Sequence, residues 1–357
     1  MSVSADLGAA RPADAPIGAP IAAPRPPRGR RADLDRVKGL AILLVVFGHI
    51  VARQDPAHVH WYEPVRRAIY AFHMPLFFYL SGYVTWLTGQ AQAPPAAWPA
   101  LLRRRAHRLL LPFAAMGLLI ILGKLAAGTV MHVDNEPAGM ASGLADLLWH
   151  TRSSPAGSLW YLATLFALAV ATPPLLALFR FRLAPLLGLF LLLYLLPAPP
   201  ALYADRIATY AIFFGMGLAA AAAGPRWLAA IDRHRRPACA VFCLLLIAAA
   251  ALPAWPEPTR LLLVGAVSMP ALHGLLRHRR LASERILTTL GRYSLMIYLF
   301  NTIFIGLAKG LMLHVESWNG PHFLLFAWVL TAAGVLGPLA LKRYGLRAVP
   351  ALDRLTD

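Results

Sequence analysis

The stretch VKGLAILLVVFGHI, residues 37–50, is an apolar segment that follows 36 mostly polar residues rich in proline and arginine. Its composition predicts a helix that contacts lipid almost to its end. The segment nevertheless carries His49, and a titratable side chain in such a helix is rare unless it has a partner or a function. His49 is therefore the first candidate for chemistry in this chain.

The composition of the whole chain indicates a membrane protein. Of its 357 residues, 59% are hydrophobic and 14% are charged, with a mean hydropathy of +0.59, outside the usual range of a soluble domain. A window of about 20 residues predicts an all-α polytopic protein with about ten transmembrane helices. The apolar segments lie near residues 37–53, 66–90, 109–130, 158–178, 184–198, 203–223, 237–254, 260–275, 288–313 and 321–341.

The net charge of +18 is explained by where the basic residues lie. Twenty-five of the 34 Lys and Arg residues fall in one alternating set of connections, which includes both chain ends, and six fall in the other set. This asymmetry follows the positive-inside rule and predicts that both termini are cytoplasmic. The charge is therefore topological, and we expect no nucleic-acid partner.

These patterns predict three regions. Residues 1–32 hold too few large apolar side chains to fold and are expected to form a disordered cytoplasmic tail. Residues 33–345 form the transmembrane domain, and residues 346–357 a cytoplasmic C-terminal tail. The first apolar segment is interpreted as a retained anchor, because the long tail before it and ARQDPAH after it do not suit a cleaved signal peptide.

Common catalytic motifs are missing from the sequence. It contains no Walker loop, GxSxG elbow, HExxH pair or dinucleotide fingerprint, and no metal site is predicted. Cys239 and Cys243 are four residues apart in one apolar helix and are interpreted as packing residues. The 16 acidic residues all lie in the tail, in connections or at segment edges. The scarcity of buried carboxylates weighs against a proton- or cation-coupled transporter.

Two intramembrane histidines are predicted to reach similar depth from opposite sides. Lys38 and His49 are eleven residues apart, so they share nearly one helix face about 16 Å apart along the axis. The next segment returns from outside, and His73 lies six residues beyond Arg67, or about 9 Å inward. Pro75 removes a backbone donor and is expected to loosen the helix beside His73.

A pair of arginines precedes the third apolar segment. The sequence RRRAHRLLLP places Arg105 and Arg108 at positions i and i+3, on one helix face. Two guanidinium groups on one face suit bidentate contacts with phosphate. The pair predicts docking of an anionic ligand from the cytoplasm.

Taken together, these motifs resemble the acyltransferase-3 family, in the form of its fucose 4-O-acetylase-like members. DRVKGLAILLVVFGH is similar to the family's first-helix motif, with Lys38 and His49 in the places of its basic residue and histidine. FHMPLFFYLSGY resembles the second-helix motif, RRRAHRLLLPF the Arg-x-x-Arg motif, and SLWYL and LGRYSLMIYLF later signatures. Many members have a histidine directly after the last signature, where this chain has Asn301.

The resemblance implies a membrane O-acyltransferase that moves an acyl group from cytoplasmic acyl-CoA to a carbohydrate. Lys38, Arg105 and Arg108 would hold the phosphates of acetyl-CoA, the acyl donor. His49 would be the general base, since imidazole can accept a hydroxyl proton without a permanent buried charge.

Other roles stay open at this point. His73 could orient the acceptor, bind the thioester oxygen or position His49, and an acyl-histidine intermediate is a second route. Trp160 and Tyr161 open the fourth segment and are assigned to the acceptor. Ser81 and Gly82 are interpreted as packing residues and His273 as a helix contact.

The sequence also suggests an acceptor, a location and two competing functions. The acceptor is expected to be a cell-surface or lipid-linked carbohydrate, and the connection at residues 131–157 is expected to recognise it. The protein is expected to lie in a bacterial cytoplasmic membrane, in contact with its lipid. Succinyl could replace acetyl. The competing functions are a proton-linked transporter or flippase of an envelope glycan precursor, supported by the histidine pair, and a non-catalytic scaffold.

Overall fold

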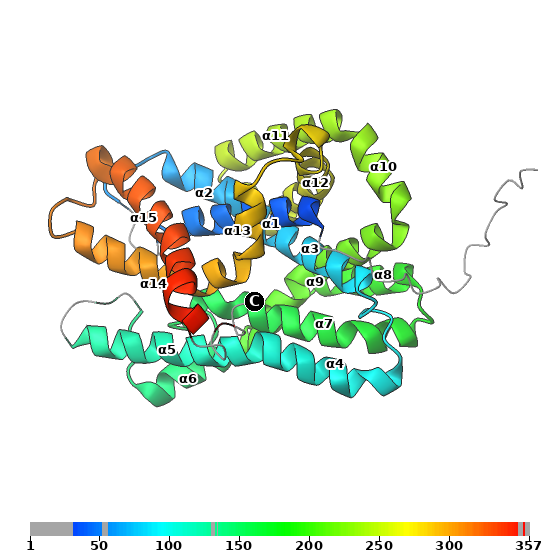
Figure 1. The fold of residues 1–357 in the computed structure, drawn as a ribbon, viewed down its shortest axis with the longest axis horizontal. Helices are drawn as coiled ribbons and strands as arrows, with labels where there is room; N and C mark the ends of the chain where they lie inside the picture. The colour runs from blue at the N-terminus through cyan, green and yellow to red at the C-terminus, as the bar shows by residue number, and fades with distance from the viewer. Residues whose placement is uncertain (1–30, 52–55, 130–132, 134, 349–352, 354–357) are drawn as a thin grey trace, which may run out of the picture.

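The fold is a bundle of helices (Figure 1). The computed structural model describes residues 31–51, 56–129, 133, 135–348 and 353. Within these ranges there is no strand, only one isolated bridge between Ala57 and Asn319. The predicted all-α class is confirmed, whereas the predicted tails, residues 1–32 and 346–357, lie mostly outside the described residues.

Several helices can cross a bilayer. The described residues contain six helical segments that are long and apolar enough, or seven if a pair bent by 70° forms one span. The number ten and the sides of the termini stay predictions. The six are Pro95–Gly128, Gly157–Leu178, Ala201–Ala223, Glu257–Leu276, Ser294–Met312 and Gly320–Gly345, and the bent pair is Pro225–Arg233 with Arg235–Ala251.

The first predicted segment forms α1 (Ala32–Gly48), and the second is divided into α2 (Tyr62–Tyr70) and α3 (His73–Leu87). The break follows from Pro75, which has no N–H to offer the carbonyl of Ala71. The loosening predicted beside His73 is thus observed. Helix α1 also ends earlier than expected, because His49 is its C-terminal cap instead of an interior residue.

Most of the remaining helices follow one another with short connections; the connection between α5 and α6 is longer. The third apolar segment is continuous with α4 through η2, a π-helical turn that suits Pro112, which cannot donate to the carbonyl of Arg108. These helices are α4 (Trp98–Arg105), η2 (Ala106–Leu110), α5 (Leu111–Gly128), α6 (Met140–Leu148), α7 (Trp160–Leu178), α8 (Leu183–Leu195), α9 (Ala204–Ala223), α10 (Pro225–Arg233), α11 (Arg235–Ala251), α12 (Glu257–Leu276), α13 (Ile286–Arg292), α14 (Ser294–Met312) and α15 (Gly320–Ala340).

Glycines permit a close helix crossing near the pocket. Helices α3 and α9 pack along each other, and a Cβ at Gly82 would lie 2.0 Å from the carbonyl oxygen of Phe214. A Cβ at Gly217 would likewise lie 2.0 Å from the carbonyl oxygen of Tyr79. The two backbones can touch only because each helix contributes a glycine there. The packing role predicted for Gly82 is confirmed.

The connection predicted as an outer loop, residues 131–157, contains a helix that folds back along the bundle. Helix α6 packs against α5, where Gly143 faces Ile121 and Leu147 faces Gly117. As a result, α7 begins beside η2 and runs along α4 instead of α5 (Figure 1). This return brings the start of α7 next to the two arginines.

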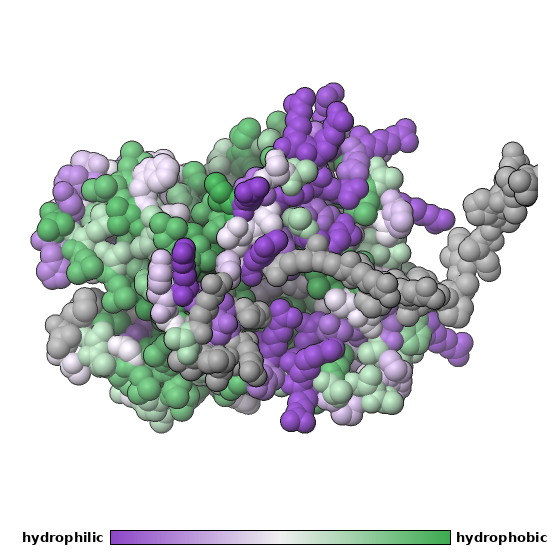
Figure 2. All heavy atoms as spheres, in the orientation of Figure 1, coloured by the Kyte–Doolittle hydropathy of each residue, from purple (hydrophilic) through white to green (hydrophobic). Residues whose placement is uncertain are grey.

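The surface fits a protein embedded in lipid. Hydrophilic side chains gather around α4, α10 and the adjoining ends of α11 and α12, while α5, α14 and α15 present a mainly apolar face (Figure 2). Leu311 of α14 is 74% exposed and Trp328 of α15 is 78% exposed. Apolar side chains this exposed over several helices are expected where lipid covers them.

Candidate active site

The predicted basic residues meet in one pocket of about 150 Å³. Lys38 reaches it from α1, Arg105 from the end of α4, and Arg108 from the π-helical turn. Helices α3, α7 and α14 complete the wall. The structure thus brings together the three cations that the family resemblance assigns to the donor.

Arg105 is held against α3. Its Nη2 donates to the hydroxyl of Thr85 at 3.2 Å, and that hydroxyl donates to the carbonyl of Ser81 at 2.7 Å. Its Nε is buried, with no acceptor among the residues that the structure describes. A buried guanidinium nitrogen without an acceptor, in a pocket with two further cations, suits an anionic ligand.

Trp160 and Tyr161 lie in different surroundings, although the sequence analysis assigned both to the acceptor. Tyr161 lines the basic pocket, where its hydroxyl lies 2.8 Å from that of Ser81, another pocket residue. Trp160 instead packs against two other aromatic rings, with its ring centroid 5.9 Å from that of Phe78 and 4.9 Å from that of Tyr210. Tyr161 thus shares the pocket of the arginines, and Ser81 is more than a packing residue.

His49 lies just beyond this pocket. Its backbone N–H donates to the carbonyl of Val45, which lines the pocket one helical turn earlier. One turn of helix is about 5.4 Å. The imidazole Nδ1 lies 2.8 Å from Oδ1 of Asn301, a fully buried residue of α14.

Two tyrosines anchor the end of α1 at this point. The Tyr62 hydroxyl lies 2.9 Å from the carbonyl of Phe47, and the Tyr70 hydroxyl donates to the carbonyl of Gly48 at 2.8 Å. The last carbonyls of a helix have no partner within it, so these bonds supply one. They fix the backbone that carries His49.

His73 stands at the start of α3, buried beside the same anchor. Its ring packs on Tyr70 with centroids 5.0 Å apart, and its Nδ1 donates to the carbonyl of Ile69 at 2.8 Å. A carbonyl can only accept, so the ring hydrogen of neutral His73 is on Nδ1 and its Nε2 is an acceptor. Met74, the next residue, lines the pocket.

Asn301 is the site residue that sequence reasoning left without a role. It is separated from His49 by 252 positions, so no local pattern connects the two. The available signal was an amide inside an apolar helix, directly after the LGRYSLMIYLF motif. A buried amide needs hydrogen-bond partners, and His49 is one of them.

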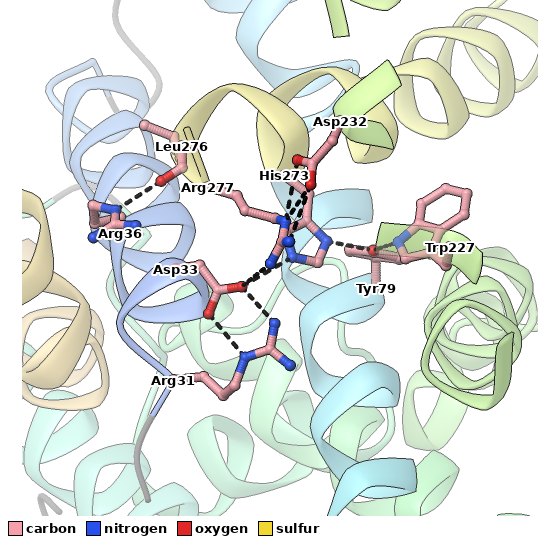
Figure 3. Close-up of polar contacts among 9 residues, drawn as sticks. All are labelled: Arg31, Asp33, Arg36, Tyr79, Trp227, Asp232, His273, Leu276 and Arg277. Carbon is pink, nitrogen blue, oxygen red and sulfur yellow. Dashed lines mark hydrogen bonds and ion pairs between the residues drawn. The ribbon is translucent and has the colours of Figure 1, made fainter. Parts of the chain in front are cut away.

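A second polar cluster lies at the opposite end of α1 (Figure 3). His273, predicted as a helix contact, is fully buried with Nδ1 2.7 Å from the hydroxyl of Tyr79, which also accepts from Trp227 Nε1 at 2.9 Å. Its Nε2 lies 3.7 Å from the carboxylate of Asp33, which Arg31 contacts at 2.6 Å. The cluster joins α1 to α3, α10 and α12.

The charges of this cluster stabilise ionised Asp33. Burial opposes the charge, but His273 and Arg31 outweigh that effect and hold the pKa of the Asp33 carboxyl well below its usual range. Arg36 adds a bond from Nε to the carbonyl of Leu276 at 2.7 Å. The start of α1 is thus fixed five residues before Lys38.

Fold and pocket together define a helical membrane protein whose basic pocket ends beside two histidines. The sequence model of the acyltransferase-3 family, described as an acyltransferase domain, matches residues 31–343. The match covers most of the chain, which therefore belongs to this family.

Similar proteins include two that are both called nodulation protein NolL. The protein of Sinorhizobium fredii is 31% identical over 140 residues, which are 39% of this chain and 34% of the relative. That of Mesorhizobium japonicum is 38% identical over 58 residues, 16% of each. The chain thus matches about a third or less of the length of these relatives. No solved structure shows significant similarity to it.

Proposed function

We propose that this protein is a membrane acyltransferase that moves an acetyl group from cytoplasmic acetyl-CoA to a hydroxyl of a cell-envelope carbohydrate, in a bacterial cytoplasmic membrane. The observation that carries the proposal is that the cationic pocket lies next to both histidines. Three cations share a pocket, and residues that line it lie one helical turn or less from each histidine. A donor anchored by its phosphates could therefore present its thioester to a base.

The cationic pocket supports a CoA donor. Guanidinium groups bind phosphate oxygens in pairs, and Arg105 has a buried nitrogen available for such a contact. Lys38 adds a point charge from another helix. In this proposal the phosphates stay with the arginines while the flexible arm of CoA runs along α3 toward His49.

His49 would act as the general base. The carbohydrate oxygen attacks the thioester carbonyl carbon, its proton passes to Nε2 of His49, and the C–S bond breaks to release CoA as thiolate. The protonated imidazole can return that proton to the thiolate. General bases of this kind typically contribute about 10²- to 10⁴-fold to the rate.

One hydrogen bond of His73 supports a role at the acceptor. Its Nδ1–H is already donated to Ile69, so the neutral ring has no hydrogen to offer the thioester oxygen. Its Nε2 can accept a hydrogen bond from a hydroxyl. We assign His73 to orienting the acceptor, next to the base.

A doubly labelled donor tests this proposal. Purified protein in lipid is given acetyl-CoA with one isotope in the acetyl group and another in the CoA portion, together with envelope glycans of a bacterial host. The proposal predicts that only the acetyl label reaches carbohydrate. Transport of a glycan across the bilayer with no movement of the acetyl label would contradict it and favour the flippase.

A further inference from the structure

We propose that Asn301 is a positioning residue that orients His49 and fixes its tautomer, with the hydrogen on Nδ1 and Nε2 left to accept a proton. The inference rests on the proposed role of His49 as base. It assigns a function to a residue for which the sequence alone predicted none.

The surroundings of Asn301 determine which way its amide points. The amide nitrogen lies 3.0 Å from the carbonyl of Ile297 and 2.7 Å from that of Tyr298, both on the preceding turn of α14. Carbonyl oxygens only accept, so the NH₂ group must face them. The reversed amide would place its oxygen against two carbonyl oxygens. Oδ1 therefore faces His49.

The orientation of the amide determines the tautomer of the imidazole. Oδ1 is an acceptor, so His49 Nδ1, 2.8 Å away, must carry the hydrogen. In the neutral ring the other nitrogen is then an acceptor. No residue in the described part of the chain bonds to His49 Nε2. The nitrogen needed for proton transfer is thus both basic and available.

The pair lies at the inner end of the basic pocket. Val45 and Tyr298 both line the pocket, and His49 and Asn301 follow them by four and three residues on the same helices. Both members therefore lie about one turn, or 5 Å, further along α1 and α14. Helices α1 and α14 also contact each other, which holds the pair together.

An amide suits this position better than a charged residue. It fixes the ring without placing a permanent charge in the protein interior, where an unpaired charge is costly. Cysteine proteases use a buried asparagine behind a histidine in a comparable way. Asn301 is fully buried, consistent with a residue that acts through His49 instead of touching substrate.

The test compares Asn301→Leu, His49→Ala and the double variant in the acetyl-transfer assay. Leucine has a similar volume and removes the acceptor. We expect kcat to fall about 10- to 100-fold in Asn301→Leu, as for residues that orient a functional histidine. The KM for acetyl-CoA should stay within about twofold, since Asn301 is outside the pocket. Thr302→Val, the adjacent polar-to-apolar change on α14, is the matched control.

The double variant separates positioning from a general loss of structure. If Asn301 acts through His49, the double variant is no slower than His49→Ala alone. Stabilisation of each variant by acetyl-CoA reports that the donor pocket is intact.

Three results would overturn the inference. Activity of Asn301→Leu within twofold of wild type would show that the contact has no catalytic consequence. Additive losses in the double variant would show a structural role independent of His49. Full transfer by His49→Ala would refute the proposed base itself, whereas an inactive His49→Ala beside an active Asn301→Leu would overturn only the inference about Asn301.

Discussion

The guanidinium of Arg105 donates to the hydroxyl of Thr85 at 3.2 Å, which holds a residue from the end of α4 against the last turn of α3. The contact leaves the Arg105 Nε buried without an acceptor in the described part of the chain. Because Thr85 also bonds to the backbone of α3, the guanidinium is preorganised on the pocket wall. Preorganised donors lose little freedom when an anion binds.

Replacing both pocket arginines, Arg105→Ala with Arg108→Ala, should abolish most stabilisation by acetyl-CoA. A ligand at 100 times its Kd stabilises a protein by about 2.7 kcal/mol, and we expect less than about 1 kcal/mol in this variant. Thermal unfolding in lipid, with and without acetyl-CoA, measures the difference. The matched control is Arg103→Ala with Arg104→Ala, two exposed arginines on the same helix that should retain the full shift. Equal losses of stabilisation in both double variants would show that acetyl-CoA responds to the overall positive charge of this region and not to the pocket.

The two adjacent aromatic residues of α7 should differ in their effect on the donor. Tyr161→Phe removes a hydroxyl from the pocket and leaves Ser81 without that partner, so KM for acetyl-CoA should rise about three- to tenfold, corresponding to about 1 kcal/mol. Trp160→Phe should lower thermal stability while leaving this KM unchanged, because Trp160 packs away from the pocket. Steady-state kinetics of the two variants test the assignment. The opposite pattern would place Trp160 at the donor.

The crossing of α3 and α9 should not tolerate a side chain. Gly217→Ala places a Cβ 2.0 Å from the Tyr79 carbonyl oxygen, so the helices must move apart at a cost of about 1–3 kcal/mol. The measurement is the midpoint of thermal unfolding. Gly123→Ala and Gly188→Ala serve as controls, since a Cβ at either position meets nothing within 4 Å. An unchanged midpoint in Gly217→Ala would mean that the helices are further apart than described.

The stability contributed by ionised Asp33 should depend on pH in a defined direction. A carboxyl whose pKa is lowered in the folded state stabilises it above the unfolded pKa of about 3.9, and this stabilisation is lost as pH falls below that value. Asp33→Asn should therefore be about 2 kcal/mol less stable than the wild type at pH 7. This loss is smaller than that expected for breaking a fully buried ion pair, because the Arg31 side chain is 27% exposed. The difference should narrow below about pH 4. Denaturation of both proteins across pH 3 to 8 measures it, and a difference that grows toward low pH would contradict the assignment.

Much of the site could be predicted because its residues lie in short local motifs. Lys38 with His49, and Arg105 with Arg108, each lie close together in the sequence, so helical spacing and the family resemblance were sufficient to select them. The all-helical class followed from hydropathy, and the break beside His73 from the chemistry of Pro75.

Other features depend on packing between distant segments and could not be predicted. The contact of His49 with Asn301 joins positions 252 residues apart. The return of α6 along α5 arises from a connection without a strong apolar pattern, and it moves Tyr161 from the predicted acceptor side to the arginines. The end of α1 at Gly48 depends on hydroxyls from Tyr62 and Tyr70, which no property of the α1 sequence reveals.

The most direct test of the central claim is acetyl transfer to envelope carbohydrate by His49→Ala, measured beside its stabilisation by acetyl-CoA. The account predicts that transfer falls at least about 100-fold, the lower limit for loss of a general base, while acetyl-CoA still stabilises the variant as it does wild type. Transfer within a few-fold of wild type would show that His49 is not the base and would contradict the account.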